Sequence, residues 1–576
     1  MRSFIDSAAR REWFAPAIIA LAAFVAVVSA IDPAGDYPDA PQGPGLTIDE
    51  IFNVQEGARL VEGWKAFALG AINLRDLYGD EKMLGNQRPP LGYHFKDHPP
   101  LGRMWLGVFH HLTRAIVPPR DHETFFVTAC ARVGSAAAFA LTVYLVGLTG
   151  ARWYGFRGGV VAAIALVLMP RVYGHAHIAA LESTAGLAYL AAILVVASRW
   201  PSAFGSMATT EGPTWRTWAA TGAFFGFAML TKIQGILIPP AVALWALFHW
   251  RMRAIRPLMI WGLAGLAVFF VGWPWLWFDP LHHFLEYLGR TTDRMGVNVW
   301  YLGQKFADRD VPWHFPAVMF ATTVPVGLHL LGLLGVQCGA RPAWKEPREQ
   351  ALLAGMLFPI ALFSYSSVVV YDGERLFLVS FLIWALLIGR GGASLWSWLE
   401  QKLSHRTACV LITLFLLLQG YGVVAYNPNH LSYYNLAVGG LRGADRLGFE
   451  RTYWGESLTR EFLEEVVQVV PEGARIDVVP VLHRFQLLDM LEQSPLLRKH
   501  QVRLVPFDSN NVRETRYLLF FHRFADLPDA IREGKFRGLL LEEVRCEGIP
   551  LAALYEWDGF ATGNSSSAES RPTAER

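Results

Sequence analysis

Two short polar clusters in this 576-residue chain contain side chains that could carry out a group transfer. The first is the acidic pair Asp49–Glu50, and the second is segment 98–103, with the sequence His-Pro-Pro-Leu-Gly-Arg. Each lies beside an apolar run, at opposite ends of one polar stretch. A carboxylate can accept a proton from a hydroxyl, and an arginine can bind a phosphate. The two clusters therefore predict a site that activates an acceptor and holds an anionic leaving group.

The acidic pair has a second interpretation, as the start of a helix. Thr47 is suited to be the N-cap, and Glu50, three residues later, is suited to be its capping-box partner. Apolar residues then follow at helical spacing through segment 50–61. Both interpretations stand, because a carboxylate in the first turn of a helix at a membrane surface can serve both roles.

More ionisable residues lie inside or beside apolar runs, where a charge is costly and needs a partner. One explanation is structural, since a lone residue there can form an ion pair or extend its charged end to water. Their combined types favour a common site with carboxylates, cations and imidazoles at one membrane boundary. The candidates, besides Asp49 and Glu50, are His98, Arg103, Arg171, His175, His177, Glu182, Lys232 and Arg375.

This set of side chains suits sugar transfer from a lipid phosphate. Cations would bind the phosphate of the donor and stabilise the charge that develops on it, and a carboxylate would act as base on the acceptor hydroxyl. The polyprenyl tail of such a donor would explain why the enzyme is a membrane protein. A divalent metal held by Glu182, His175 and one carboxylate of the acidic pair is an open alternative, but no ligand spacing supports it.

The composition is that of a polytopic membrane protein. Hydrophobic residues make up 53% of the chain and charged residues 17%, whereas soluble domains carry roughly 25% charged residues. The net charge of +2, without a basic tract, gives no indication of nucleic-acid binding. The four cysteines show no spacing typical of a disulfide framework or a zinc site.

The apolar runs predict a polytopic α-helical membrane protein with about 11–13 transmembrane helices. The first run is predicted to be an uncleaved helix, because it is longer than the apolar core of a usual signal peptide and further spans follow it. The runs are 14–31, 101–117, 125–149, 158–170, 183–198, 217–231, 233–250, 257–278, 315–337, 351–371, 376–389 and 407–426.

Lysine and arginine residues in short loops predict the orientation, because they favour the cytoplasmic side. Four such loops alternate consistently, and they carry Arg152 and Arg157, segment 251–256, segment 341–348 and segment 390–406. The acidic pair, segments 279–314 and 371–375, and everything after Tyr426 are then extracytoplasmic.

The predicted orientation leaves one membrane span too many. The polar stretches 31–100 and 118–124 are both predicted outside, yet the single run 101–117 separates them. Either 101–117 or 158–170 therefore does not span the membrane. The run 101–117 opens with two prolines and contains Arg103 and His110, so it is poorly suited to lipid.

The residues after Tyr426 predict a small second domain. Segment 427–560 is more charged, with helical periodicity at 458–470 and 525–533 and strand-like runs at 475–481, 502–506, 516–521 and 539–544. We predict three parts: a catalytic membrane domain at 1–426 whose first extracytoplasmic loop is 31–100, an extracytoplasmic α/β domain at 427–560, and a disordered tail at 561–576.

The polar motifs resemble those of one enzyme family. Asp49–Glu50 and segment 98–103 resemble the Asp-Glu and His-Pro-Pro-Leu-Gly-Lys motifs of the protein O-mannosyltransferases, which are family 39-like glycosyltransferases of the GT-C fold. The resemblance covers about residues 1–460. Further similar segments begin at Arg132, Arg171, Lys232, Tyr371, Leu431 and Tyr453.

The resemblance implies an inverting hexosyltransferase of the bacterial inner membrane that builds the cell envelope. It would move a sugar from a polyprenyl-phosphate donor to a hydroxyl of a glycan, lipid or protein acceptor on the extracytoplasmic face. Asp49 would match the catalytic base and Glu50 its neighbour, while Lys232 and Arg375 would hold phosphate. The chain departs from the family at Arg103, where lysine is usual, and at Glu182, where aspartate is usual.

Two other functions remain open. A transporter or a lipid-sugar flippase would move its substrate without covalent chemistry, but such proteins usually show repeats and polar groups at mid-membrane. A membrane anchor that presents segment 427–560 is a third interpretation, and rescue of a deletion strain by that segment alone would favour it.

Overall fold

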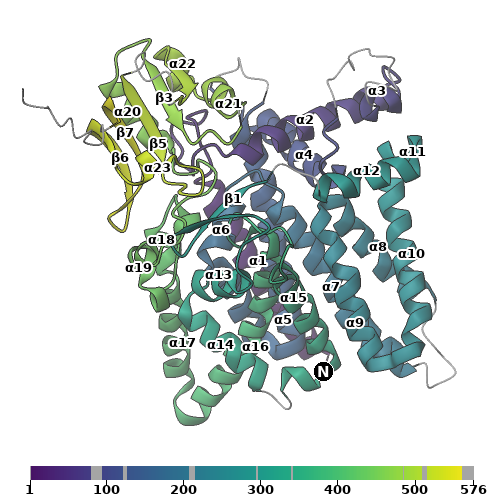
Figure 1. The fold of residues 1–576 in the computed structure, drawn as a ribbon. Coiled ribbons are helices and arrows are strands. Elements are labelled where there is room, and N and C mark those ends of the chain that lie inside the picture. The colour runs from purple at the N-terminus through teal and green to yellow at the C-terminus, as the bar shows by residue number, and fades with distance from the viewer. Residues whose placement is uncertain are drawn as a thin grey trace, which may run out of the picture.

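The computed structural model describes residues 2–79, 94–120, 126–206, 215–292, 296–338, 342–483, 485–508 and 516–560. A body of apolar helices carries a small β-sheet domain at one end (Figure 1). The tail predicted at 561–576 lies outside the described residues. The main helices of the body are α1 (Arg2–Val28), α5 (Thr128–Val167), α7 (Glu182–Ser206), α8 (Trp215–Thr231), α9 (Ile238–Trp250), α10 (Ile255–Gly272), α15 (Pro347–Phe363), α16 (Val379–Lys402) and α17 (His405–Gln419).

Five helical stretches in the described residues are long and apolar enough to cross a membrane, or six if one bent pair counts as a span. The helix α5 holds two of the predicted runs, because its chain turns at Gly155, whose φ is +80°. A Cβ atom on Gly159 would lie 2.5 Å from the carbonyl oxygen of Gly147. Small residues thus let the two legs of α5 pack closely.

The run predicted at 315–337 is broken. The helices α13 (Phe315–Thr323) and α14 (Val326–Gln337) meet at an angle of 110°. The cause is Pro325, because a residue that precedes proline is disfavoured in helical conformation. Val324 is accordingly extended, with φ −103° and ψ 138°.

One of the two runs that could account for the excess crossing forms α4 (Pro100–Ile116), which packs beside α2 (Ile48–Ala68) at the sheet-bearing end of the body (Figure 1). One face of α4 buries Arg103, Leu106 and His110, while the other exposes apolar side chains such as Leu112 and Ile116. The helix is not among the stretches long and apolar enough to span. This amphipathic pattern suits a helix that lies in the membrane surface.

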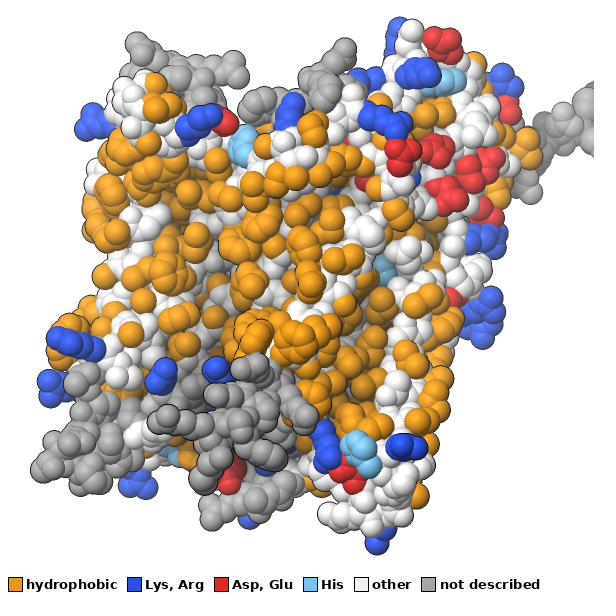
Figure 2. All heavy atoms as spheres, turned by 180° about the vertical axis from the view of Figure 1, so that it is seen from behind, with side chains coloured by type: hydrophobic (Ala, Val, Ile, Leu, Met, Phe, Trp, Pro, Cys, Tyr) orange, Lys and Arg blue, Asp and Glu red, His pale blue; other side chains and the backbone are white. Residues whose placement is uncertain are grey.

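The surface supports placement in a membrane. Figure 2 shows hydrophobic side chains in a broad band between two charged ends. Contacts at the end opposite the sheet join three of the four basic loops: Arg157 pairs with Glu400 at 2.6 Å, and Arg348 stacks on Trp153 with its guanidinium 4.5 Å from the ring centre. With the apolar helices, this arrangement identifies an integral membrane protein.

The C-terminal region contains the predicted mixture of helices and strands. Its five-stranded sheet has the order β4-β3-β5-β7-β6, in which β3 pairs in parallel with β4 and β5, and β7 pairs in antiparallel fashion with β5 and β6. The strand β7 and the helices α21 and α22 were not predicted. The elements are α20 (Arg460–Val469), β3 (Arg475–Val479), α21 (Phe485–Gln493), α22 (Pro495–Lys499), β4 (Arg503–Pro506), β5 (Tyr517–Phe521), α23 (Asp529–Arg532), β6 (Phe536–Cys546) and β7 (Ile549–Phe560).

The segment between α17 and α20 packs on the membrane helices. Tyr434 and Phe449 belong to the same buried cluster as those helices. Asn435 donates through Nδ2 to the carbonyls of Ala321 and Val324, both at 2.7 Å, and so satisfies backbone groups at the break after α13. Smaller elements near this end are α3 (Leu74–Tyr78), α6 (Pro170–Ala176), α11 (Trp275–Phe278), α12 (Pro280–Thr292), β1 (Asn298–Tyr301), β2 (Gln304–Ala307), α18 (Tyr421–Ala425) and α19 (Gly440–Arg446).

Candidate active site

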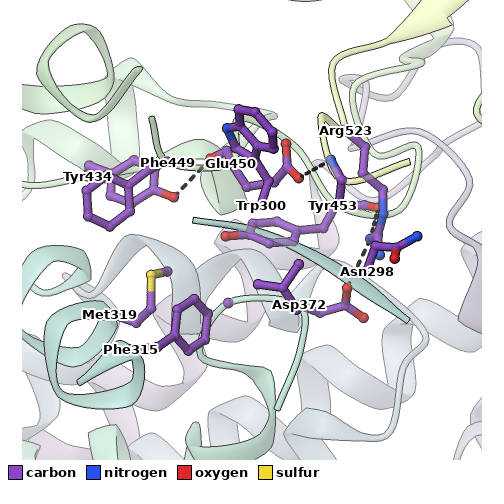
Figure 3. Close-up of a pocket in the computed structure, with 13 residues that line it drawn as sticks. Asn298, Trp300, Phe315, Met319, Asp372, Tyr434, Phe449, Glu450, Tyr453 and Arg523 are labelled. Atoms are coloured by element: carbon purple, nitrogen blue, oxygen red, sulfur yellow. Dashed lines mark hydrogen bonds and ion pairs between the residues drawn. The ribbon is translucent and has the colours of Figure 1, made fainter. Parts of the chain in front are cut away.

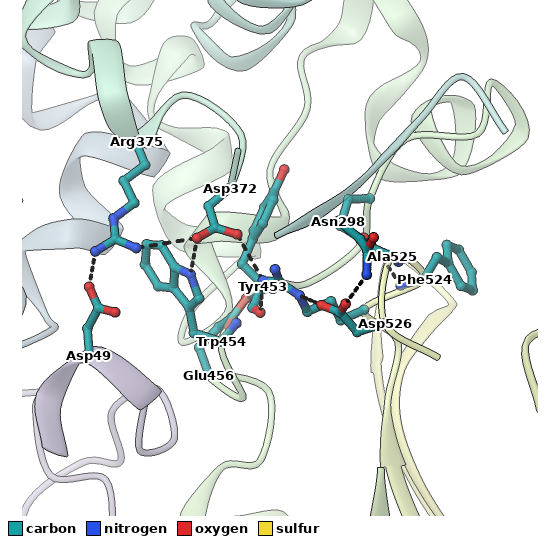
Figure 4. Close-up of polar contacts among 12 residues, drawn as sticks. Asp49, Asn298, Asp372, Arg375, Tyr453, Trp454, Glu456, Phe524, Ala525 and Asp526 are labelled. Carbon is teal, nitrogen blue, oxygen red and sulfur yellow. Dashed lines mark hydrogen bonds and ion pairs between the residues drawn. The ribbon is translucent and has the colours of Figure 1, made fainter. Parts of the chain in front are cut away.

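Asp49 lies in the first turn of α2 and points toward a buried arginine. Arg375 donates from Nη2 to Asp49 Oδ2 (Figure 4). The Asp49 side chain keeps 22% of its surface exposed, whereas that of Arg375 keeps 9%. The carboxylate is therefore both paired with a cation and open to a substrate.

Arg375 is the centre of a charged cluster. Its Nε donates to Glu182 Oε1 at 2.7 Å, and Glu182 Oε1 also pairs with Lys232. Its guanidinium lies 4.8 Å from the ring centre of Trp454. The structure thus brings together four predicted site residues: Asp49, Glu182, Lys232 and Arg375.

Helix ends explain this convergence. Glu182 is the first residue of α7, Lys232 directly follows α8, and Arg375 begins a short 3-10 turn before α16. The turn before Arg375 is tight, since Asp372 has φ +54° and Gly373 has φ +63°. All these helix ends lie at the end of the body that carries the sheet (Figure 1).

Several buried polar atoms around the cluster have no hydrogen-bond partner. They are Nδ1 of His98 and His175, Nη2 of Arg171 and Oε2 of Glu182. An unpaired buried polar group costs about 1–3 kcal/mol. Such atoms are suited to receive the polar groups of a ligand.

A second ion pair lies next to this cluster. Arg171 donates from Nη1 to Glu374 Oε2 at 2.7 Å and from Nε to the Tyr433 carbonyl at 2.9 Å. Its guanidinium stacks 4.5 Å from the ring centre of Tyr434. His175 Nε2 lies 3.9 Å from the other oxygen of Glu374. The predicted residues Arg171 and His175 therefore share one carboxylate.

Glu50 has a different environment from Asp49. Its carboxylate is fully buried and accepts two bonds of 2.7 Å from Arg132. It also accepts from the backbone N–H of Thr47 at 2.9 Å and of Ala179 at 2.6 Å. The capping box is present, and these contacts leave the carboxylate enclosed by protein.

Arg103 lies apart from the charged cluster. Its guanidinium forms two bonds of 2.8 Å with Asp97 and donates to Asn53 Oδ1 at 3.0 Å. These contacts tie α4 to α2 and to the segment before α4. His98 lies next to this pair, with Nε2 3.9 Å from Asp97.

The metal alternative has no support in the part of the chain that the structure describes. There, no three His, Cys, Asp or Glu side chains are placed to hold a metal ion. Glu182, the proposed ligand, instead contacts the two cations Lys232 and Arg375.

Sequence reasoning did not name four residues around the cluster as site residues: Asp372 and Trp454 contact Arg375, Glu374 pairs with Arg171, and Arg523 pairs with Asp372. Asp372 and Glu374 flank Arg375 in one motif, so their spacing was a signal for them. Trp454 and Arg523 follow far along the chain, and Arg523 had no signal, because charged residues are common in its domain.

A small pocket lies behind Asp372 (Figure 3). Burial raises the pKa of the Glu450 carboxyl there to about 8, and the Arg523 charge and the N–H groups of Ala525 and Phe524 partly oppose the shift. The other lining residues are mostly aromatic or charged: Trp300, Phe315, Tyr434, Phe449, Tyr453, Arg523 and Asp372.

A family model matches part of this chain. Residues 97–278 match the family model described as dolichyl-phosphate-mannose-protein mannosyltransferase. The matched segment contains His98, Arg103, Arg171, His175, Glu182 and Lys232. A search of curated protein sequences finds no match.

Solved structures show distant similarity. One is ArnT from Cupriavidus metallidurans bound to undecaprenyl phosphate, with 13% identity, TM-score 0.46 and coverage of 93% of this chain and 97% of that chain. Its apo form gives 14% identity, TM-score 0.47 and the same coverage. The arabinofuranosyltransferase AftD from Mycobacteria gives 15% identity and TM-score 0.39, over 94% of this chain and 41% of that chain.

The family match falls on the helices that carry Glu182 and Lys232, and these residues meet Asp49 and Arg375 at one end of an apolar helical body. The part of this integral membrane protein that carries Glu182 and Lys232 is thus similar to a family of glycosyltransferases.

Proposed function

We propose that the protein transfers a sugar from a polyprenyl-phosphate donor to an acceptor hydroxyl on the extracytoplasmic face, with inversion at the anomeric carbon. The matching family is named for a dolichyl-phosphate sugar, which supports a lipid-phosphate donor. The observation that carries the proposal is the contact of Asp49 with Arg375, beside Lys232, at one end of the helical body.

In the proposed reaction, Asp49 accepts the proton of the acceptor hydroxyl. The hydroxyl oxygen attacks the anomeric carbon while the bond from that carbon to the phosphate oxygen breaks. The polyprenyl phosphate leaves with the electron pair, and a single displacement inverts the carbon. Arg375 and Lys232 supply positive charge where the leaving phosphate develops negative charge.

Arg375 has a double task in this mechanism. In the structure it pairs with Asp49 and Glu182. A bound phosphate would compete for the guanidinium and so free the Asp49 carboxylate for the acceptor proton. Glu182 would keep Lys232 and Arg375 next to each other, although both are cations.

The remaining predicted residues support this centre. Glu50 fixes the start of α2, because Arg132 and two backbone N–H groups hold its carboxylate. Arg103 fixes the segment that bears His98. His175 and Arg171 would offer their unpartnered nitrogens to the donor.

A donor panel tests the proposal. Purified protein in nanodiscs is incubated with polyprenyl-phosphate monosaccharides of different sugars, water serves as the substitute acceptor, and mass spectrometry follows the release of free sugar and polyprenyl phosphate. The glycans lost from a deletion strain show which sugars to include. We expect release from at least one donor. Movement of the intact donor across vesicles, without release from any donor, would favour a flippase instead.

A further inference from the structure

We propose that the Arg523–Asp372 ion pair positions Arg375, so that the C-terminal domain sets how well the site binds a lipid phosphate. This inference rests on the function proposed above. Arg523 follows β5 in the C-terminal domain, whereas Asp372 and Arg375 belong to the loop before α16. Arg523 and Asp372 are proposed as positioning residues, because they act through Arg375, which lies between them and Asp49.

A continuous series of contacts joins Asp49 to the C-terminal domain (Figure 4). Arg375 pairs with Asp49 and, through Nη1, lies 3.3 Å from Asp372 Oδ2. Asp372 Oδ1 lies 2.9 Å from Arg523 Nη1. Arg523 in turn donates from Nε to Asp526 Oδ2 at 2.6 Å. Charges therefore alternate in sign along the whole series.

The charges of these side chains interact strongly because the side chains are buried. The side chains of Arg523, Asp372 and Arg375 keep 4%, 6% and 9% of their surface exposed. Water screens such charges much less than it screens surface charges. Removal of the Arg523 charge therefore changes the electrostatic potential at Arg375.

The backbone around Asp372 shows that the loop is held in place. Asp372 has φ +54°, a conformation that is uncommon outside glycine. Its Oδ2 accepts from Trp454 Nε1 at 2.9 Å, and Glu456 fixes Trp454 by accepting the N–H groups of Tyr453 and Trp454. Such a conformation persists only where surrounding contacts determine it.

Three carboxylates compete for Arg375, namely Asp49, Glu182 and Asp372. Arg523 forms an ion pair with Asp372, and Trp454 donates a hydrogen bond to it. These contacts weaken the attraction between Asp372 and Arg375. Without the Arg523 charge, Asp372 would hold Arg375 more tightly and add net negative charge near the phosphate. Without the Asp372 charge, Arg375 would be freer to bind phosphate.

Affinity for undecaprenyl phosphate, measured by native mass spectrometry on the full-length protein, tests this inference. We expect Arg523→Gln to weaken binding about fivefold and Asp372→Asn to strengthen it about fivefold. The reason is the electrostatic interaction of each side-chain charge with the charge of the bound phosphate, at a separation of roughly 10 Å. The double variant should lie between them. Arg523→Lys keeps the charge and should restore most of the affinity.

Arg451→Gln is the matched control. Arg451 lies before α20 and pairs with Asp445 at 2.6 Å, with its guanidinium stacked on Phe524. We expect this variant to lose some thermal stability and to keep the wild-type affinity.

The outcomes separate the two proposals. Wild-type protein that does not bind undecaprenyl phosphate would overturn the proposed function and this inference with it. Wild-type binding with unchanged affinity in Arg523→Gln and Asp372→Asn would overturn only the inference. Weaker binding in both variants would do the same, because it indicates a merely structural pair.

Discussion

Asp49 and Glu50 are neighbours in sequence but have opposite surroundings. Asp49 is partly exposed and contacts one arginine, whereas Glu50 is enclosed by Arg132, Thr47 and Ala179. We expect Glu50→Gln to destabilise the protein by about 3 kcal/mol, because it leaves the Arg132 charge buried without its partner. Thermal unfolding in detergent measures this loss. Asp49→Asn is the control and should unfold at the wild-type temperature, and equal unfolding temperatures for all three proteins would contradict the assignment.

We expect the stability of the protein to depend on pH through Asp489. This carboxyl lies on α21, and burial, then the charges of Glu50 and Glu492, raise its pKa from 3.8 to about 7. The fold favours the protonated form, so the stability it contributes is full below about pH 4 and is lost as the pH rises to about 7. We expect Asp489→Asn to exceed the wild type in stability at pH 8 by about 2–4 kcal/mol.

Unfolding temperatures of Asp489→Asn and wild type at pH 5 and pH 8 test this expectation. The advantage of the variant should shrink at pH 5, where the carboxyl of the folded wild type is almost fully protonated. An advantage that is the same at both pH values would show that Asp489 does not titrate in this range.

The sequence predicted the central residues of the candidate site but not all their contacts. Asp49, Glu182, Lys232 and Arg375 were predictable, because a charge beside an apolar span requires a partner. Glu50 and Arg103 have the same residue types, yet protein groups already satisfy them. Sequence cannot separate the two cases, since the partners of Arg103 include a backbone carbonyl and an amide.

At the scale of elements, close glycine contacts join α14 to α16. A Cβ atom on Gly391 would lie 1.8 Å from the Leu331 carbonyl oxygen, and one on Gly335 would lie 1.9 Å from that of Leu387. We expect Gly391→Ala to destabilise the protein by about 1–3 kcal/mol, because the two helices would have to separate. The unfolding temperature in detergent measures the effect.

Gly262→Ala provides the matched control for that substitution. Gly262 lies in α10, and nothing lies within 4 Å of the position its Cβ would take. Alanine is favoured over glycine in helices by about 1 kcal/mol, so this variant should be as stable as the wild type or more so. A similar loss in both variants would show that the α14–α16 contact is not specific.

Long apolar helices were predicted better than their breaks. Long apolar runs identify helices by length and composition, as for α7, α8 and α16. The break at Pro325 was missed because the apolar run continues through it. The strand β7 was missed because Glu547 and Gly548, both with positive φ, form a turn without the usual Asn-Gly or Asp-Gly sequence.

At the scale of the whole molecule, the two charged ends should face opposite sides of the membrane. In a cysteine-free background, we expect Lys305→Cys, in the strand β2, to react with a membrane-impermeant maleimide in intact spheroplasts. Lys402→Cys, at the basic end, should react only after permeabilisation. Both side chains are exposed. The reverse pattern would contradict the extracytoplasmic placement of the site.

The most direct measurement is a single turnover with donor already bound. Wild-type protein and Asp49→Asn are loaded with the donor found in the panel, loading is matched by native mass spectrometry, and polyprenyl phosphate is counted after acceptor is added. We expect the variant to bind donor at least as tightly as the wild type and to release polyprenyl phosphate at least about 100-fold more slowly, which is typical for loss of a general base. Release at the wild-type rate would mean that Asp49 does not take the acceptor proton.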